Sequence, residues 1–215
     1  MDSHILRLLN SNKIFGLAWN WKGGAKLKPF PVIFQKAVSS IIPSGGTVII
    51  PKSETVLHEL ELACFISKKA KNVPKSEAMD YIQGYCLALD MTSPSILTRH
   101  KEHGLSWDIG KGYDTFLPLS QYFPAKCISN PSNIDLELTI NNQIRQKGNT
   151  KDLVFGIPEI IEYLSNIFTL NEGDLILTGT PPGASQVNPN DSLHGKMMEN
   201  GKIIAELSAK IQSGL

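Results

Sequence analysis

The chain has 215 residues, of which 41% are hydrophobic and 19% are charged. This apolar content is enough to bury a core, so the composition excludes an intrinsically disordered chain. The formal charge of +1 lacks the excess of lysine and arginine on which nucleic-acid and anionic-membrane binding depend, so we expect neither partner. No run of about 18 apolar residues is present, and no helix is expected to span a bilayer.

The cysteines and the first residues bear on the cellular compartment. Cys64, Cys86 and Cys127 are odd in number and form no CxxC pair, which is typical of a reducing compartment and gives no zinc motif. Residues 1–9 lack the apolar core of a secretory signal, and Asp2 is unusual in a mitochondrial presequence. From the cysteine pattern and the lack of a secretory signal, we expect the protein to lie in the cytoplasm or in mitochondria.

The first half of the chain is expected to form strands around one short helix. Residues 47–50, which end at Pro51, and residues 55–66 are each expected to form a strand. Pro74 suits the first turn of a short helix that would end near Gly84. Residues 85–90 are apolar enough for a buried strand.

The second half begins with a helix and continues with strands and tight turns. Ser93 is expected to cap a helix that has Pro94 at its first position and stops at Gly104. Apolar residues alternate with polar ones over 134–140, which predicts a half-buried strand. The remaining expectations are an Asn141–Asn142 turn, an amphipathic helix over 158–168, a strand over 174–177 and an Asn200–Gly201 hairpin. Together these elements predict a strand-rich α+β domain, and no glycine-rich phosphate loop follows an early strand.

Two acidic residues stand out in the second predicted strand. Glu59 and Glu61 are two positions apart, so their side chains should share a face of the strand. That face continues with Ala63 and Phe65, which places the two acids at the mouth of a core. Neighbouring carboxylates in a partly dry site repel each other, and a hard cation such as Mg²⁺, Mn²⁺ or Ca²⁺ would relieve that repulsion. A solvated strand face with two ordinary glutamates is the alternative.

Three further features are ambiguous when each is taken alone. Asp90, at the end of a buried strand, is either a helix cap or a third oxygen ligand. Lys111 lies between Gly110 and Gly112, which permit close approach of a ligand, or it is an ordinary surface lysine. The loop 178–181 follows a strand end, where binding sites are common, or it is a plain tight turn.

In combination, several motifs resemble the fumarylacetoacetate hydrolase superfamily, in particular its small single-domain branch of acylpyruvases and oxaloacetate decarboxylases. The resemblance runs from about Pro31 to the C-terminus. The motifs that carry it are HELEL (58–62), MDYIQGY (79–85), LALDMT (87–92), GLSW (104–107), KGYDTF (111–116), RQKG (145–148) and EGDLILTGTP (172–181).

For the fold, the resemblance implies a mixed rolled sheet or pseudo-barrel, as in the C-terminal domain of fumarylacetoacetase, and a homodimer. It divides the chain into an N-terminal extension with a divergent lid segment over 1–30 and a catalytic domain over 31–215. For the site, the resemblance implies Mg²⁺ or Mn²⁺ bound by three carboxylates. These ligands are Glu59, Glu61 and Asp90.

The resemblance also implies how a substrate is bound. Lys111 and Thr180 match catalytic positions of the family, and Lys111, Gly179 and Thr180 match positions beside a small 2-oxo acid substrate. Such a substrate would chelate the ion through its carboxylate and 2-oxo oxygens, and the ion would act as a Lewis acid. Lys111 would add positive charge where an oxyanion develops.

One segment departs from the family pattern. Active members carry a histidine and a glutamate three residues apart in an N-terminal lid, where they are thought to orient and deprotonate water, whereas residues 16–27 contain no histidine and no acid. Trp19 and Trp21, at strand spacing, either form a new apolar lid or pack against a dimer partner. Where the family often has arginine and glutamine facing the substrate, this chain has Pro94 and Leu97.

The expected function is therefore a divalent-metal-dependent hydrolase or lyase. It would cleave acylpyruvates or decarboxylate oxaloacetate, both small 2-oxo acids. One alternative is an oxaloacetate keto–enol tautomerase, which needs less from a base. Another is a catalytically degenerate relative that still binds metal and a dicarboxylate. His100, Glu102 or His103 could replace the missing base, although a solvated helix face is the plainer interpretation of these residues.

Overall fold

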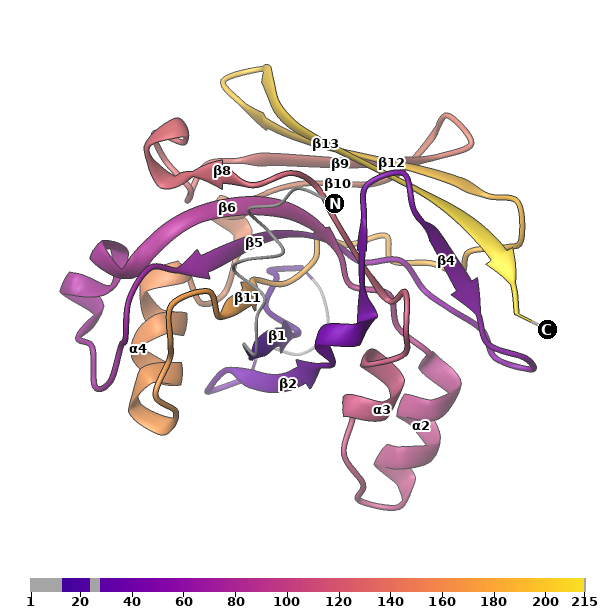
Figure 1. The fold of residues 1–215 in the computed structure, drawn as a ribbon, viewed down its shortest axis with the longest axis horizontal. Helices are drawn as coiled ribbons and strands as arrows, with labels where there is room; N and C mark the ends of the chain where they lie inside the picture. The colour runs from indigo at the N-terminus through magenta and orange to yellow at the C-terminus, as the bar shows by residue number, and fades with distance from the viewer. Residues whose placement is uncertain (1–12, 24–27, 215) are drawn as a thin grey trace.

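A computed structural model describes residues 13–23 and 28–214 of the chain. The expectations for residues 1–9 and for the part of the lid segment at 24–27 lie outside these described residues. Two sheets dominate the fold, one of eight strands and one of five, and the smaller sheet lies across the curved larger one (Figure 1). The strand-rich α+β class expected from the sequence is confirmed.

The larger sheet mixes strands from both ends of the chain. Its order is β2-β1-β11-β5-β6-β7-β3, with β8 paired to β6. Its strands are β1 (Ile14–Ala18), β2 (Val32–Lys36), β3 (Ile41–Pro43), β5 (Leu60–Ile66), β6 (Ile82–Leu89), β7 (Leu117–Leu119), β8 (Phe123–Pro124) and β11 (Leu175–Leu177). Because β1 runs parallel to β11 and antiparallel to β2, the N-terminal strand is embedded inside the sheet.

The smaller sheet is built from the C-terminal half of the chain plus one early strand. Its order is β10-β9-β12-β13-β4. Its strands are β4 (Thr47–Ile50), β9 (Asp135–Ile140), β10 (Gln143–Asn149), β12 (Ser192–Glu199) and β13 (Lys202–Ser213). The turns that join β9 to β10 and β12 to β13 fall at the expected pairs Asn141–Asn142 and Asn200–Gly201, and all four of these residues have positive φ.

The helices within residues 13–23 and 28–214 are few and short. They are α2 (Pro94–Glu102), α3 (Asp108–Lys111), α4 (Ile157–Ile167) and the 3₁₀ segments η1 (Val38–Ser40), η2 (Lys75–Tyr81), η3 (Ala125–Cys127) and η4 (Thr150–Asp152). The amphipathic helix expected over 158–168 is α4, which buries Ile160, Ile161 and Leu164. None of the described helices is long and apolar enough to cross a membrane.

Two expectations about helix ends differ from the structure. The segment after Pro74 is a 3₁₀ helix that ends at Tyr81, and Gly84 lies inside β6. A Cβ atom at Gly84 would stand 2.2 Å from the carbonyl oxygen of Phe123, so this glycine permits the close approach of β8 and does not end a helix. Ser93 precedes α2 as expected, but its side chain makes no capping bond; Ser93 Oγ donates instead to Glu54 Oε2 at 2.9 Å.

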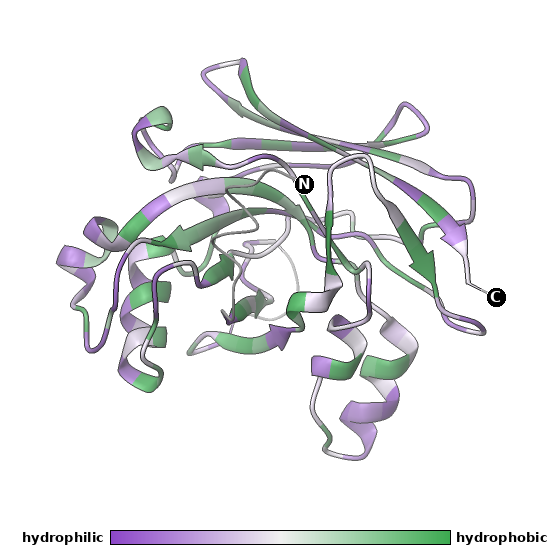
Figure 2. Cartoon of the chain, in the orientation of Figure 1, coloured by the Kyte–Doolittle hydropathy of each residue, from purple (hydrophilic) through white to green (hydrophobic). Residues whose placement is uncertain are grey.

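Strand β5 is buried along its whole length and separates two apolar clusters. Leu60, Leu62 and Cys64 belong to the larger cluster, which also contains α4, whereas Ala63 and Phe65 belong to a smaller cluster on the opposite face. The neighbouring strand β11 is hydrophobic throughout (Figure 2). The first five residues of the strand expected over 55–66 lie outside β5, with only isolated bridges at Leu57.

Candidate active site

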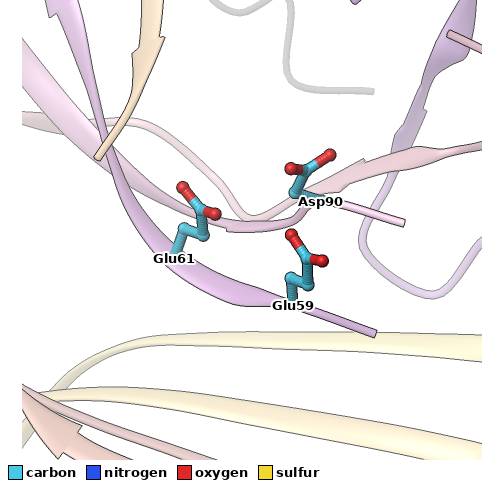
Figure 3. Close-up of side chains that lie close together, drawn as sticks. All are labelled: Glu59, Glu61 and Asp90. Atoms are coloured by element: carbon cyan, nitrogen blue, oxygen red, sulfur yellow. The ribbon is translucent and has the colours of Figure 1, made fainter. Parts of the chain in front are cut away.

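Three carboxylates meet where β5 begins and β6 ends. Glu59 immediately precedes β5, Glu61 lies within it, and Asp90 follows β6. One oxygen of each carboxylate lies within 4.8 Å of the corresponding oxygens of the other two. Figure 3 shows the three side chains converging. Glu59 and Glu61 thus share a face, and their convergence with Asp90 follows from the antiparallel pairing of Leu60 with Leu89.

Two buried lysines neutralise part of this acidic cluster. Lys111 Nζ lies 2.8 Å from Glu59 Oε2 and 2.6 Å from Asp90 Oδ2. Lys36 Nζ, at the end of β2, lies 2.7 Å from Asp90 Oδ1 and donates to the carbonyl oxygens of Met91 and Lys111. Asp90 therefore acts as the hub of the cluster and does not cap α2.

The charges explain the direction of each pKa shift. Burial, together with Asp90 and Glu59, raises the pKa of Glu61 well above its usual value, and burial also raises the pKa of Glu59. Although burial by itself would raise the pKa of Asp90, Lys111 and Lys36 hold it below the usual value. Burial would likewise lower the pKa of Lys111, but Asp90 and Glu59 outweigh that effect and raise it.

Glu61 is the carboxylate that no lysine contacts. Among the described residues, its side chain accepts one hydrogen bond, from the backbone N–H of Gly179 at 2.6 Å. Three carboxylates face two ammonium groups, so the cluster carries one negative charge in excess when all five groups are ionised. Clustered carboxylate oxygens with excess negative charge fit a hard divalent cation, and Glu59, Glu61 and Asp90 are the residues that could hold it.

The loop after β11 forms a second wall of the site. Gly179 has φ +105, a backbone conformation that L side chains rarely adopt, and this conformation aims its N–H at Glu61. Thr178 Oγ1 donates to the carbonyl oxygen of Leu62 at 2.8 Å, and Thr180 Oγ1 donates to that of Leu60 at 2.9 Å. The loop is thereby fixed along the edge of β5.

A buried glutamine joins this loop to a third segment. Gln146, on β10, donates through Nε2 to Thr180 Oγ1 (2.8 Å) and to the carbonyl oxygen of Pro181 (2.7 Å). Its Oε1 accepts from the Leu60 N–H (3.0 Å) and lies 2.9 Å from His58 Nδ1. Because the backbone donor fixes the orientation of the amide, Nδ1 of His58 carries the proton. Burial lowers the pKa of His58, which favours this neutral form.

A cavity of about 300 Å³ opens beside the three carboxylates. Glu59, Glu61, Lys111 and Thr180 line it, as do all three tryptophans of the chain, Trp19, Trp21 and Trp107. No histidine is among the described residues that line this cavity.

The structure revises two interpretations of the residues around this cavity. Trp19 and Trp21 are not at strand spacing, because β1 ends at Ala18 and Trp19 turns with φ +57. The residues considered as replacement bases, His100, Glu102 and His103, do not line the cavity, and His100 Nδ1 donates to the carbonyl oxygen of Ser106 at 2.7 Å.

The structure brings all the sequence-predicted site residues to one place. Glu59, Glu61, Asp90, Lys111, Gly179 and Thr180 each contact another member of the cluster or line the cavity. Sequence reasoning gave no role to Lys36, Gln146 or Asn20, which hold this site together. Asn20 binds Thr178 and Phe155 through three hydrogen bonds. The only signal was that Gln146 lies in the RQKG motif (145–148).

The described fold is a curled sheet with three clustered carboxylates, which could hold a metal ion, at the ends of two neighbouring strands. The family described as fumarylacetoacetate (FAA) hydrolase C-terminal matches residues 13–211. The chain therefore belongs to the fumarylacetoacetate hydrolase family.

Known proteins extend this likeness. A protein of Arabidopsis thaliana named oxaloacetate tautomerase FAHD1, mitochondrial, is 49% identical over 158 residues, which cover 73% of this chain and 71% of the relative. Oxaloacetate decarboxylase, mitochondrial, of Dictyostelium discoideum is 44% identical over 168 residues, 77% of each chain. The crystal structure of fumarylpyruvate hydrolase from Pseudomonas aeruginosa with Mn²⁺ and pyruvate has a TM-score of 0.86 at 27% identity, covering 94% of this chain and 90% of that one.

Proposed function

We propose that this chain is a divalent-metal-dependent enzyme that interconverts the keto and enol forms of oxaloacetate. The observation that supports this proposal is a carboxylate triad beside a cavity whose described lining contains no histidine to activate water. Tautomerisation moves one proton from C3 to the 2-oxo oxygen and breaks no carbon–carbon bond, so it needs no attacking water. The names of the relatives from Arabidopsis and Dictyostelium support oxaloacetate as the substrate.

The residues of the site have distinct roles in this proposal. Glu59, Glu61 and Asp90 would hold Mg²⁺ or Mn²⁺, which supplies a Lewis acid for the oxygens of a 2-oxo acid. The Mn²⁺ in the fumarylpyruvate hydrolase structure supports such a metal. Lys111 stays protonated and places positive charge where the 2-oxo oxygen becomes negative.

Gly179 and Thr180 complete the proposed substrate wall. We propose that they contact the substrate carboxylate and that Thr180, like Lys111, is a catalytic residue. The Thr180 hydroxyl donates its hydrogen bond to the Leu60 carbonyl oxygen, so in the described arrangement the backbone N–H of Thr180 would contact the substrate carboxylate.

Decarboxylation of oxaloacetate to pyruvate is the second candidate. Loss of CO₂ leaves negative charge on the same 2-oxo oxygen and also needs no attacking water, and one relative is named for this reaction. Acylpyruvate hydrolysis fits the cavity less well, because the carboxylates of Glu59 and Glu61 would have to serve both as metal ligands and as the base for water.

Turnover of oxaloacetate tests the proposal. With Mg²⁺ or Mn²⁺, purified protein should accelerate decay of the enol ultraviolet absorbance without release of pyruvate, and Glu59→Ala should abolish the acceleration. Pyruvate release at the same rate would establish decarboxylation instead. If metal and oxalate raise the melting temperature while neither signal changes, the protein is a binder and the proposal fails.

We also propose a homodimer with a mitochondrial location. The family resemblance supports the dimer, and the relatives named as mitochondrial support the location. Light scattering should give twice the chain mass of 23.6 kDa, and a C-terminally tagged chain should co-purify with mitochondria.

The division into a lid segment over 1–30 and a catalytic domain over 31–215 stays a prediction, although β1 of the described structure lies within the larger sheet. Proteolysis would test that division, since cleavage near residue 30 should release a stable C-terminal fragment.

A further inference from the structure

A lysine stands between two aromatic rings on the solvent side of the cavity. Lys101, in the last turn of α2, lines the cavity together with Trp19 and Trp107. Its Nζ lies 4.3 Å from the ring centroid of Trp107 and 5.2 Å from that of Trp19. The two rings meet edge to face, with centroids 4.9 Å apart and an interplanar angle of 86°. Both distances fall in the range of cation–π attraction.

The cavity has an exposed end and a buried end. Glu61 and Lys111 are buried, whereas Lys101 is exposed and Trp19 is 36% exposed. The last turns of α2 are hydrophilic (Figure 2). The cavity thus leads from a cationic, aromatic entrance to a buried acidic centre.

Lys101 has the charge that an anionic group would need. The charged residues that line the described cavity are Glu59, Glu61, Lys101 and Lys111. Lys111 is bound to two carboxylates, but no carboxylate of the described residues lies within ion-pair distance of Lys101. Leu97, one helical turn earlier on the same face of α2, lines the cavity with an apolar side chain. Of the two residues that α2 contributes, Lys101 alone can pair with an anion.

The backbone beside Trp19 is held by buried hydrogen bonds of the next residue, Asn20. Asn20, which follows Trp19, is 3% exposed. Its Nδ2 donates to the carbonyl oxygens of Thr178 (2.8 Å) and Phe155 (2.9 Å), and its Oδ1 accepts from the Phe155 N–H (2.8 Å). Trp19 itself has φ +57, which is rare for a bulky residue and requires surroundings that hold it. The backbone next to Trp19 is therefore tied, through Asn20, to the same loop that contacts Glu61.

We propose that Lys101, positioned by Trp19 and Trp107, binds the second carboxylate of a 2-oxo diacid and makes this site prefer diacids to 2-oxo monoacids. The inference rests on the proposed function, since it assumes that the 2-oxo end of the substrate lies at the carboxylate triad. A four-carbon diacid held there carries its other carboxylate toward the entrance. A 2-oxo monoacid offers no second carboxylate to the Lys101 ammonium.

Pyruvate and oxaloacetate test this proposal because they differ by that one carboxylate. All three tryptophans line the cavity, so their fluorescence reports its occupancy directly. With Mg²⁺ present, Lys101→Gln should raise the dissociation constant and the KM for oxaloacetate about tenfold, leaving kcat and the dissociation constant for pyruvate within twofold of wild type. Lys101→Arg, which keeps the charge, should stay within about threefold of wild type.

The controls separate recognition from folding and from turnover. Lys68, whose Nζ lies 4.5 Å from the Tyr81 ring centroid away from the cavity, is a matched cation–π lysine, and Lys68→Gln should change neither constant. Trp107→Leu should raise the KM for oxaloacetate with kcat unchanged, and should add nothing in the Lys101→Gln background. The Lys101 and Lys68 variants should melt within about 2 °C of wild type, as expected of substitutions at exposed positions.

Two results would overturn the inference: unchanged oxaloacetate affinity in Lys101→Gln, or equal weakening of oxaloacetate and pyruvate. These results are distinct from failure of the proposed function. If wild type binds oxaloacetate in a Lys101-dependent manner but turns it over no faster than buffer, the enzymatic proposal fails and the recognition by Lys101 stands.

Discussion

A single buried carboxylate, Glu61, accounts for much of the chemistry of the site. Its neighbours Glu59 and Asp90 each have an ammonium group within 3 Å, whereas Glu61 has one backbone N–H. Burying a charge without a counter-charge is unfavourable, so an ionised Glu61 lowers the free energy of unfolding of the chain. A divalent cation would remove the cost, which links metal binding to the free energy of unfolding.

Replacing Glu61 with glutamine tests that link. Metal at about 100 times its dissociation constant adds about 2.7 kcal/mol to the free energy of unfolding, which raises the melting temperature by roughly 5 to 10 °C in a chain of this size. We expect wild type to show this rise with Mn²⁺ and Glu61→Gln to show almost none. Without metal, the variant should melt no lower than wild type, because its buried charges balance. A full Mn²⁺ response in Glu61→Gln, measured by calorimetry, would remove Glu61 from the ligand set.

At the residue scale, the sequence predicted the acids better than the groups that hold them. Glu59 and Glu61 were recognisable because strand periodicity places them on one face. Lys36 was not recognisable, because nothing in the local sequence distinguishes it from an ordinary surface lysine. It is buried only because Asp90, 54 residues later, and the Lys111 carbonyl, 75 residues later, come to lie against it. No local pattern encodes such a contact.

At the scale of elements, Gln146 connects the two sheets through the site. It belongs to β10 of the smaller sheet, and its amide reaches Leu60 in β5 and the loop at Thr180 and Pro181. One side chain thus sets the position of the loop whose glycine contacts Glu61. Buried networks of this kind are costly when one partner is removed, because the remaining polar groups lose their partners.

Truncation of the Gln146 side chain should therefore lower the free energy of unfolding. In Gln146→Ala, the Leu60 N–H and the Pro181 carbonyl oxygen lose their partner, and we expect the free energy of unfolding to fall by about 2 to 4 kcal/mol. Gln143→Ala, at an exposed position of the same strand, should change it by less than about 0.5 kcal/mol. Urea unfolding measures both. Equal effects of the two substitutions would show that the network contributes little.

Elements with a strong local signal were predicted well. Helix α4 has apolar residues at helical spacing, and the Asn141–Asn142 and Asn200–Gly201 turns carry residues that tolerate positive φ. Elements defined by distant partners were predicted less well. Residues 55–59 belong to the strand expected over 55–66, yet they form only isolated bridges, at Leu57. Gly84 permits the close approach of β8 and does not end a helix. The pairing order of the strands is likewise set by tertiary packing.

At the scale of the whole molecule, the three thiols report how tightly the larger sheet is packed. Burial raises the pKa of Cys64 to about 12 and also raises that of Cys86, so at pH 8 both remain protonated, whereas Cys127 is exposed. A disulfide reagent at pH 8 should titrate one thiol per native chain and three after denaturation. Cys127→Ser should leave the native chain unreactive. Rapid reaction of a second native thiol would mean that the sheet opens readily.

The site itself is a property of the complete chain. Its contributors come from β2, the start of β5, the end of β6, α3, β10 and the loop after β11, so no short fragment contains it. This spacing is why the motifs appeared ambiguous one by one in the sequence and became informative only in combination.

The position of β1 also bears on how the protein is made. This strand, at Ile14–Ala18, lies between β2 and β11, and β11 ends at Leu177 of 215 residues. A ribosome that adds about 5 to 20 residues per second needs roughly 10 to 30 seconds to travel from β1 to β11. Throughout that interval an apolar strand edge of the nascent chain has no partner, and such edges promote aggregation. Slower translation would lengthen this exposure. We therefore expect the soluble yield to depend on chaperones that shield the edge of β1 until β11 emerges.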